Sequence, residues 1–312
     1  MASIKSKVRT TSVSKKQLQG IIGYTLELNE KLILIGKKRM AARYATTINS
    51  LKRYLKDGDV PLKAVDGTMM QGYEQWLKDG GLCRNTTSYY LRNLRTIYNH
   101  AVDDGLVPQS SPFKHVYTGI DKTVKRALPL EIIKQLKSLD LSRNPCMELA
   151  RDIFMFSFYT RGMSFIDMAQ LTHGNLNGGM LIYRRQKTSQ QIYIKWEPYM
   201  QEIVEKYKNY NSPYLLPIAK GEGTIVWRQY KNAYNRITKH LKKLGEMIGL
   251  SIPLTTYVAR HSWASIAKSK NIALSTISEA LGHDSEKTTQ IYLSSLDTSA
   301  VDKANQLILN SI

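Results

Sequence analysis

Apolar residues recur with a helical period through the first third of the chain. Three stretches between residues 17 and 105 place apolar side chains three or four positions apart, which is the spacing of a buried helix face. Asp66 can cap the second helix, Gly80-Gly81 can end it, and Asn85 or Thr86 can cap the third. The pattern predicts a small all-helical domain over residues 17–105. The first stretch places Tyr44, Ile48, Leu51 and Leu55 on one helix face, the second carries Met70, Tyr73, Trp76 and Leu77, and the third has Leu91, Leu94, Tyr98 and Ala101 as its inner stripe.

The helical pattern stops at Pro108-Gln-Ser-Ser-Pro112, and a mixed, basic stretch follows. We place a linker over residues 106–127. Helical spacing then resumes, and two short Ile- and Tyr-rich stretches at residues 180–183 and 191–196 read as antiparallel strands. The sequence therefore predicts a second domain over residues 128–312, mostly helical with a small antiparallel sheet. The fold class is mainly α, with this α+β domain following the helical one.

The balance of charge indicates a polyanionic partner. The 312 residues carry 45 Lys and Arg against 25 Asp and Glu, for a net charge of +20 and a pI near 9.7. An anionic membrane is the rival interpretation, but no apolar run approaches the roughly 18 residues of a spanning helix. The polar N-terminus lacks a secretory signal. We expect a cytoplasmic, nucleoid-associated protein.

Two groups of cations in the first 105 residues are candidate DNA contacts. Residues 1–16 form a basic arm containing Lys5, Lys7 and Arg9, which is either a solubilising tail or an arm lying along DNA. In the third helical stretch Arg84, Arg92 and Arg95 make a plausible phosphate-contacting face. The two cysteines lie far apart, without metal-ligand spacing, so we expect neither a metal site nor a disulfide framework.

Candidate chemistry gathers near the C-terminus. Residues 254–264 supply Arg260, the turn Leu281-Gly-His supplies His283, and Tyr292 follows nine positions after the histidine. Cations and hydrogen-bond donors stabilise phosphate oxygens, and a tyrosine can attack phosphorus. This ordered set resembles the signature of tyrosine recombinases, the phage-integrase family. Residues 17–105 likewise resemble the SAM-like core-binding domain of that family.

The resemblance implies a role for further residues. The family's first arginine would fall at Ser164, but the only arginine in this turn is Arg161, as in integrases of bacterial mobile elements. We assign the role to Arg161; the alternative is another cation, with Ser164 adding a hydrogen bond. Lys187, between the two strands, matches the lysine that protonates the leaving 5′ oxygen, and Arg185 is the fallback.

Residues beside Arg260 depart from the family pattern. Tyr257 stands where the family usually has a histidine, so its hydroxyl is a possible replacement that cannot act as a cationic imidazole. His261 is expected to pack beside the site, because adjacent helical residues point apart, and Trp263 is expected to pack in the core.

Together these features imply a site-specific DNA recombinase acting through a 3′-phosphotyrosyl intermediate in integration, excision or inversion. No cofactor and no metal are implied. The expected partners are double-stranded DNA with specific sites, further copies as a dimer on a site and a tetramer in the synapse, and an accessory DNA-bending protein. Residues 301–309 would either dock on a neighbouring protomer or close their own domain. The alternatives are a type IB topoisomerase and a decayed DNA-binding protein, which the intact Arg260, His283 and Tyr292 disfavour.

Overall fold

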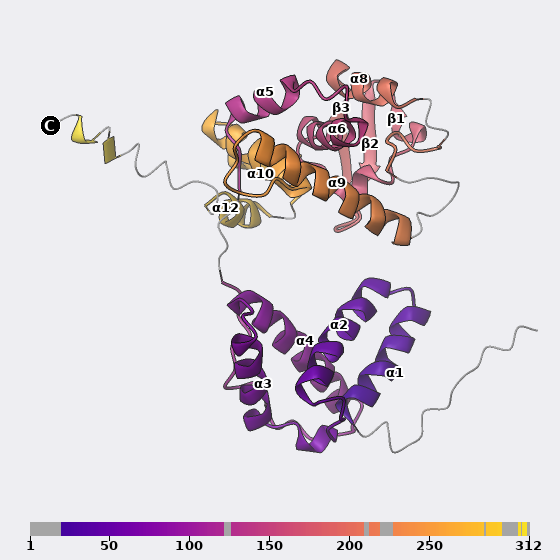
Figure 1. The fold of residues 1–312 in the computed structure, drawn as a ribbon, viewed down its shortest axis with the longest axis vertical. Helices are drawn as coiled ribbons and strands as arrows, with labels where there is room; N and C mark the ends of the chain where they lie inside the picture. Colours follow the sequence, from indigo (N-terminus) through magenta and orange to yellow (C-terminus); the bar gives the residue numbers. More distant parts are fainter. Residues whose placement is uncertain are drawn as a thin grey trace, which may run out of the picture. The chain divides into compact units, whose positions relative to one another are not determined.

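The computed structural model describes residues 20–121, 126–208, 212–218, 227–283, 285–294, 305–306 and 308–310. The chain divides into two compact units, Met1–Lys122 and Thr123–Ile312. Both are mainly helical, and the second also holds a small sheet, which confirms the predicted fold class (Figure 1). The basic arm lies outside the described residues, as does most of the expected C-terminal tail. Among the helices described, none is long and apolar enough to cross a membrane.

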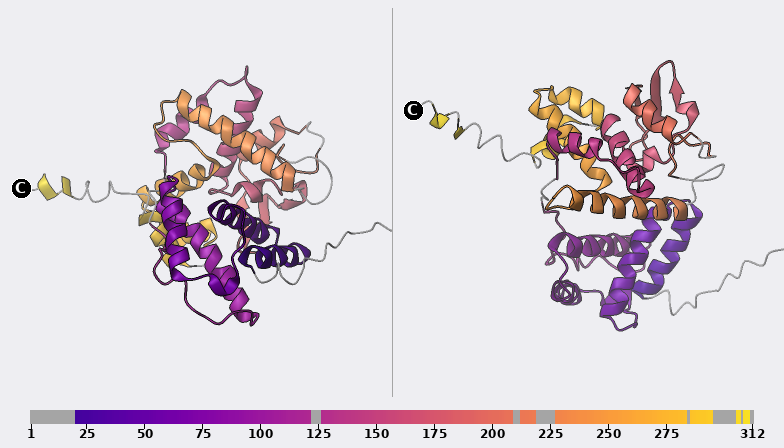
Figure 2. Two further views of the ribbon diagram at one scale, coloured as in Figure 1. Left: turned by 60° about the horizontal axis from the view of Figure 1, so that its bottom comes forward. Right: turned by 45° about the horizontal axis from the view of Figure 1, so that its top comes forward.

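The first unit is a bundle in which α1 and α2 lie side by side in every view and α4 packs on α2 and α3 (Figures 1 and 2). Asp66 caps α3 as predicted, accepting a hydrogen bond from the Met69 amide at 2.8 Å. The predicted inner positions of the third stretch are buried along α4. The elements are α1 (Ile21–Leu34), α2 (Lys38–Tyr54), the 3-10 turn η2 (Leu62–Ala64), α3 (Gly67–Asp79) and α4 (Arg84–Asp103).

Part of the segment expected as a linker belongs to this bundle. Val107, Phe113 and Val116 are buried in the same core as the inner face of α4. The Phe113 ring meets the ring of Tyr98 edge-on, with centroids 6.2 Å apart. The chain after α4 therefore folds back on its own unit.

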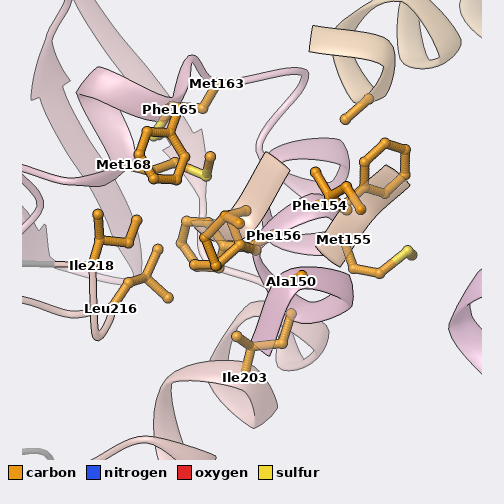
Figure 3. Packing of buried hydrophobic residues seen from close by; sticks show 14 of the residues in the cluster. Ala150, Phe154, Met155, Phe156, Met163, Phe165, Met168, Ile203, Leu216 and Ile218 are labelled. Atoms are coloured by element: carbon orange, nitrogen blue, oxygen red, sulfur yellow. The ribbon is translucent and has the colours of Figure 1, made fainter. Parts of the chain in front are cut away.

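The second unit surrounds helix α6, which packs against α5, α8, α9 and α10. Figure 3 shows side chains of α6 gathered with Phe165 and Met168 of α7 and with Leu216 and Ile218. The elements are α5 (Leu130–Ser138), α6 (Pro145–Tyr159), α7 (Phe165–Met168), the 3-10 turn η3 (His173–Asn175), β1 (Leu176–Asn177), β2 (Met180–Arg184), β3 (Gln191–Lys195), α8 (Pro198–Lys206), α9 (Trp227–Met247), α10 (Thr256–Ser269), α11 (Leu274–Leu281) and α12 (Glu286–Ser294).

The sheet is antiparallel in the order β1-β2-β3, and the predicted hairpin is its β2–β3 pair. Opposite residues Leu181 and Ile194 are buried, as are Tyr183 and Ile192. This register turns one face of the hairpin to the core and leaves its connecting turn at the surface.

A smaller apolar cluster joins the last three helices. Leu293 of α12 is 4% exposed and packs with Ile277 and Leu281 of α11 and with Ala264 and Ala267 of α10. Trp263, expected in the core, packs partly buried against this cluster. The helices that carry Arg260, His283 and Tyr292 are thus held together by their own core.

Candidate active site

Arg260 lies in α10 and is only 4% exposed. Its guanidinium donates to the Gly162 carbonyl at 3.0 Å and to the Leu281 carbonyl, and Nη2 lies 3.2 Å from His283 Nε2. Gly162 permits this approach, because a Cβ there would lie 2.5 Å from Arg260 Cα. The turn after α6 and the end of α11 therefore fix the position of this arginine.

His283 directly follows the left-handed glycine that ends α11, Gly282, whose φ is 60°. Its ring Nδ1 lies 2.7 Å from the hydroxyl of Thr289, a fully buried residue of α12. Because an arginine can only donate, the His283 Nε2 accepts from Arg260, and Nδ1 of the neutral ring then donates to Thr289. The imidazole is oriented from both sides.

Tyr292 lies in α12, three residues after Thr289. Its side chain is outside the described part of the structure, but its helix is anchored. Thr289 binds the histidine, and Leu293 is buried against α11. Residues three apart on a helix are separated by about one turn, so the backbone of Tyr292 is placed close to the Arg260–His283 pair.

Arg161 occupies the turn that follows α6 and has an unusual backbone conformation. Its φ is 60°, in the left-handed region that non-glycine residues rarely adopt. The next residue, Gly162, accepts the hydrogen bond from Arg260, while the Arg161 guanidinium donates to the Tyr193 carbonyl of β3 at 3.3 Å. Such conformations cluster at functional sites. The residue after Arg161 is thus bonded to Arg260, and the half-buried side chain of Arg161 reaches the hairpin.

The pKa of the Tyr183 hydroxyl is shifted by burial and by the charges around it. Burial raises its pKa to about 12, and the Asp167 charge adds to the rise. The positive charges of Arg185, Arg260 and Arg161 oppose it. Positive charge from three different segments of the chain therefore acts on Tyr183.

Lys187 and Arg185 take opposite positions in the hairpin. Lys187 is exposed in the turn between β2 and β3. Arg185, the fallback for the lysine, is 8% exposed, and its guanidinium donates to the carbonyls of Leu281 and Gly282. Geometry therefore favours Lys187 as the group able to reach a bound substrate.

Ser164 caps α7 and is engaged within its own turn. Its hydroxyl donates to the Asp167 carboxylate at 2.6 Å, and Asp167 in turn accepts from the Gln186 amide at 2.9 Å. The buried Asp167 thus ties the arginine turn to the hairpin turn. Asp167 and Thr289 were missed as site residues in the sequence, although the helical spacing from Thr289 to Tyr292 could have indicated the second.

Tyr257 stands one turn before Arg260 on α10 and is 48% exposed. Its ring meets the His261 ring edge-on, with centroids 4.9 Å apart, and His261 is buried. A hydroxyl on this exposed ring remains a candidate for contact with DNA.

The three candidate arginines of the first unit lie along α4, and two of them contact the chain that follows it. Arg84 pairs with Asp121 at 3.4 Å, Arg95 donates to the Thr118 hydroxyl at 2.9 Å, and Arg92 donates to the Ser88 carbonyl. Their spacing of eight and three residues places them on one helix face. Lys5, Lys7 and Arg9 lie outside the described residues.

Family models and curated relatives match most of the chain. Residues 21–117 match the phage integrase SAM-like domain, and residues 131–299 match the phage integrase family. The chain is 26% identical to tyrosine recombinase XerD of Halalkalibacterium halodurans over 235 residues, covering 70% of this chain and 74% of the relative. It is 25% identical to tyrosine recombinase XerC of Pediococcus pentosaceus over 272 residues, covering 82% and 87%.

Solved structures show the same fold. A lambda integrase dimer bound to a COC′ core site matches with a TM-score of 0.66 at 16% identity, covering 86% of this chain and 76% of that one. The Tn1549 transposon integrase in complex with transposon right end DNA matches with a TM-score of 0.62 at 13% identity, covering 93% and 99%. The chain belongs to the phage integrase family of tyrosine recombinases.

Proposed function

We propose that this recombinase cleaves and rejoins DNA at specific sites through Tyr292. The observation that carries the proposal is the chain of contacts from Arg260 to His283 to Thr289, which ends on the helix that bears the tyrosine. One phosphate bound by the arginine and the histidine would therefore lie beside the nucleophile.

In the proposed reaction the Tyr292 oxygen, on losing its proton, attacks a backbone phosphorus. The bond to the 5′ oxygen breaks, leaving a 3′-phosphotyrosyl link and a 5′-hydroxyl. Arg161, Arg260 and His283 stabilise the charge that develops on the non-bridging oxygens. Lys187 gives its proton to the departing oxygen, which leaves poorly without one. A 5′-hydroxyl from the partner strand then attacks the phosphotyrosine, which forms the new P–O bond, breaks the bond to the Tyr292 oxygen and returns a proton to that oxygen.

This scheme conserves the energy of the ester, so it needs neither a nucleoside triphosphate nor an obligatory metal. The outcome of the strand exchange is integration, excision or inversion of DNA, according to the arrangement of the recombination sites.

The partners are double-stranded DNA and further copies of the chain. A lambda integrase dimer is bound to a core site and a lambda integrase tetramer to a Holliday junction in two solved structures, and XerH is bound to its difH substrate in a third. By analogy, this chain would act as a dimer on each site and a tetramer in the synapse, with residues 301–309 docking on a neighbour. A DNA-bending protein would assist, and the place of action is the nucleoid.

DNA binding by the first unit would use the α4 face and the basic arm. Each phosphate neutralised by Arg92, Arg95 or an arm lysine releases counterions, so binding should weaken steeply with salt. Arg84 already pairs with Asp121, so its phosphate contact would compete with that ion pair.

The nucleophile is tested with a suicide substrate that carries a nick near the cleavage position and traps the covalent intermediate. Tyr292→Phe should abolish the trapped species while DNA binding persists, because only the attacking oxygen is lost. Tyr199→Phe, a matched change at a half-exposed tyrosine of α8, should trap normally. A covalent adduct in the Tyr292→Phe protein would mean that another tyrosine is the nucleophile.

A further inference from the structure

Arg185 is a buried cation beside an exposed catalytic candidate. It directly follows β2, two residues before Lys187, yet it is 8% exposed. Its Nη1 donates to the Leu281 carbonyl at 3.2 Å and to the Gly282 carbonyl. Burial of an arginine costs free energy unless its donors are used, so a buried guanidinium on two backbone acceptors has a specific structural role.

The acceptors belong to the turn that carries His283. Leu281 ends α11, and the last carbonyls of a helix lack intrahelical donors and carry partial negative charge. Arg260 donates to the same Leu281 carbonyl. Two guanidiniums, one from the hairpin and one from α10, therefore meet at the end of α11.

The hairpin and this turn are also in direct contact. A Cβ on Gly282 would lie 2.8 Å from Ile192 Cδ1 and 3.0 Å from both Arg185 Cδ and Gln190 Oε1. The base of the hairpin thus packs against the glycine with no space for a methyl group. The β2–β3 turn is also held by a second contact, because the Gln186 amide donates to the Asp167 carboxylate.

We infer that Arg185 is a positioning residue: its guanidinium locks the base of the β2–β3 turn to Leu281 and Gly282, so that Lys187 is held within reach of the leaving oxygen. This rests on the proposed function, in which the Lys187 ammonium gives its proton to the 5′ oxygen as the P–O bond breaks. Arg185 itself does not touch the substrate.

The inference is tested with two DNA substrates that differ in one atom, the bridging 5′ oxygen or a sulfur in its place. A thiolate leaves without a proton, so cleavage of the sulfur substrate does not depend on a general acid. The ratio of the two cleavage rates, measured in one preparation of protein, is independent of the folded fraction. The variants are Arg185→Met, Arg185→Lys and Lys187→Ala, and the control is Lys195→Met, a lost charge at a 77% exposed side chain of β3.

Lys187→Ala should cleave the oxygen substrate about 10²–10⁴-fold more slowly than wild type and regain most of the loss with sulfur. Arg185→Met should lose roughly 10²-fold on oxygen, the effect of a small misplacement of the acid, and should also be rescued by sulfur. Arg185→Lys, which keeps the charge but loses the planar fork of donors, should have an intermediate ratio. Lys195→Met should match wild type.

The outcomes separate the inference from the proposed function. A wild-type ratio in Arg185→Met, with rescue of Lys187→Ala, overturns the positioning role and keeps Lys187 as the acid. No rescue of Lys187→Ala removes the lysine from that role, and the inference falls with it. Rescue of Arg185→Met alone would make the arginine the acid itself, which also overturns the inference.

Discussion

The site combines two kinds of cation. Arg185 and Arg260 are almost fully buried, donate to backbone carbonyls and form, with His283, the buried half of the site. The half-buried Arg161 and the exposed Lys187 lie in turns, and we call these two residues the exposed half. The buried half comes from three segments that hold one another in place. The residues of the exposed half lie in the turn after α6 and in the turn between β2 and β3.

The difference shows how positive charge can be fixed and still be available. A neutral carbonyl acceptor orients a guanidinium and leaves its positive charge in place. A carboxylate would also orient it but would offset that charge. Donors oriented in advance need no rearrangement as transition-state charge develops. The exposed half, by contrast, can adjust when DNA arrives. Changes in the buried half should therefore affect both stability and rate, and changes in the exposed half should affect the rate alone.

Arg260→Met should produce the largest effect. It removes a donor to the phosphate and leaves the Gly162 and Leu281 carbonyls without this partner. Single-turnover cleavage should fall about 10³-fold or more. The free energy of unfolding should fall by about 1–3 kcal/mol, measured by chemical denaturation. Arg260→Lys should not restore the rate, because an ammonium lacks the guanidinium fork. Near-normal cleavage by either variant would contradict the assignment.

Arg161→Ala should cleave roughly 10²–10³-fold more slowly, with site affinity and stability nearly unchanged. Arg161→Gly is the matched backbone control. It should be equally slow but more stable than Arg161→Ala by about 1 kcal/mol, because glycine adopts the positive φ without strain.

Adding Ser164→Arg to Arg161→Ala should partly restore cleavage if the two positions reach the same phosphate. The rescue carries a cost of about 1 kcal/mol in stability, because Ser164 caps α7. Cleavage by Arg161→Ala within a few-fold of wild type would transfer the role to another cation, with exposed Arg184 the nearest choice.

Gly282→Ala comes last because we expect its main effect on stability and not on the cleavage rate. It tests how much the close packing at Gly282 contributes. Its methyl group would overlap Ile192 and Arg185, so we expect a loss of about 1–3 kcal/mol in unfolding free energy. Gly249→Ala is the matched control, because Gly249 also has a positive φ, of 74°, and a Cβ added there would meet no other atom within 4 Å. Equal losses in urea denaturation would assign the whole effect to backbone strain and none to the contact.

Local patterns predicted much of this fold. Helical stripes located α2 to α4, two Ile- and Tyr-rich stretches located the β2–β3 hairpin, and the Leu-Gly-His motif placed His283 in a turn. These features depend on residues close in sequence, such as the Asp66 cap and the left-handed Gly282. The chain also joins Arg260 to His283 as the motif implied, since each side chain leaves a short, rigid element.

The sequence could not show which cationic side chains point into the protein and which point to the surface. Arg184, Arg185 and Lys187 are neighbouring cations of similar chemistry, yet only Arg185 of the three is buried. It is buried because tertiary packing brings the end of α11 against the end of β2. The start of α4 was also misplaced: Cys83 rather than Asn85 or Thr86 is the N-cap, and Asn85 instead bonds with the backbone of Asp121. The competing partner lies 36 residues away and leaves no local signal.

Helix α12 is nine residues long and carries both the residue that orients His283 and the proposed nucleophile. Thr289 orients the histidine, and Tyr292 follows it on the same rigid segment, which Leu293 attaches to α11. A displacement of α12 would thus remove the nucleophile and release the imidazole in one step. Under the proposed mechanism, the site could therefore not keep an oriented imidazole once its nucleophile had moved away.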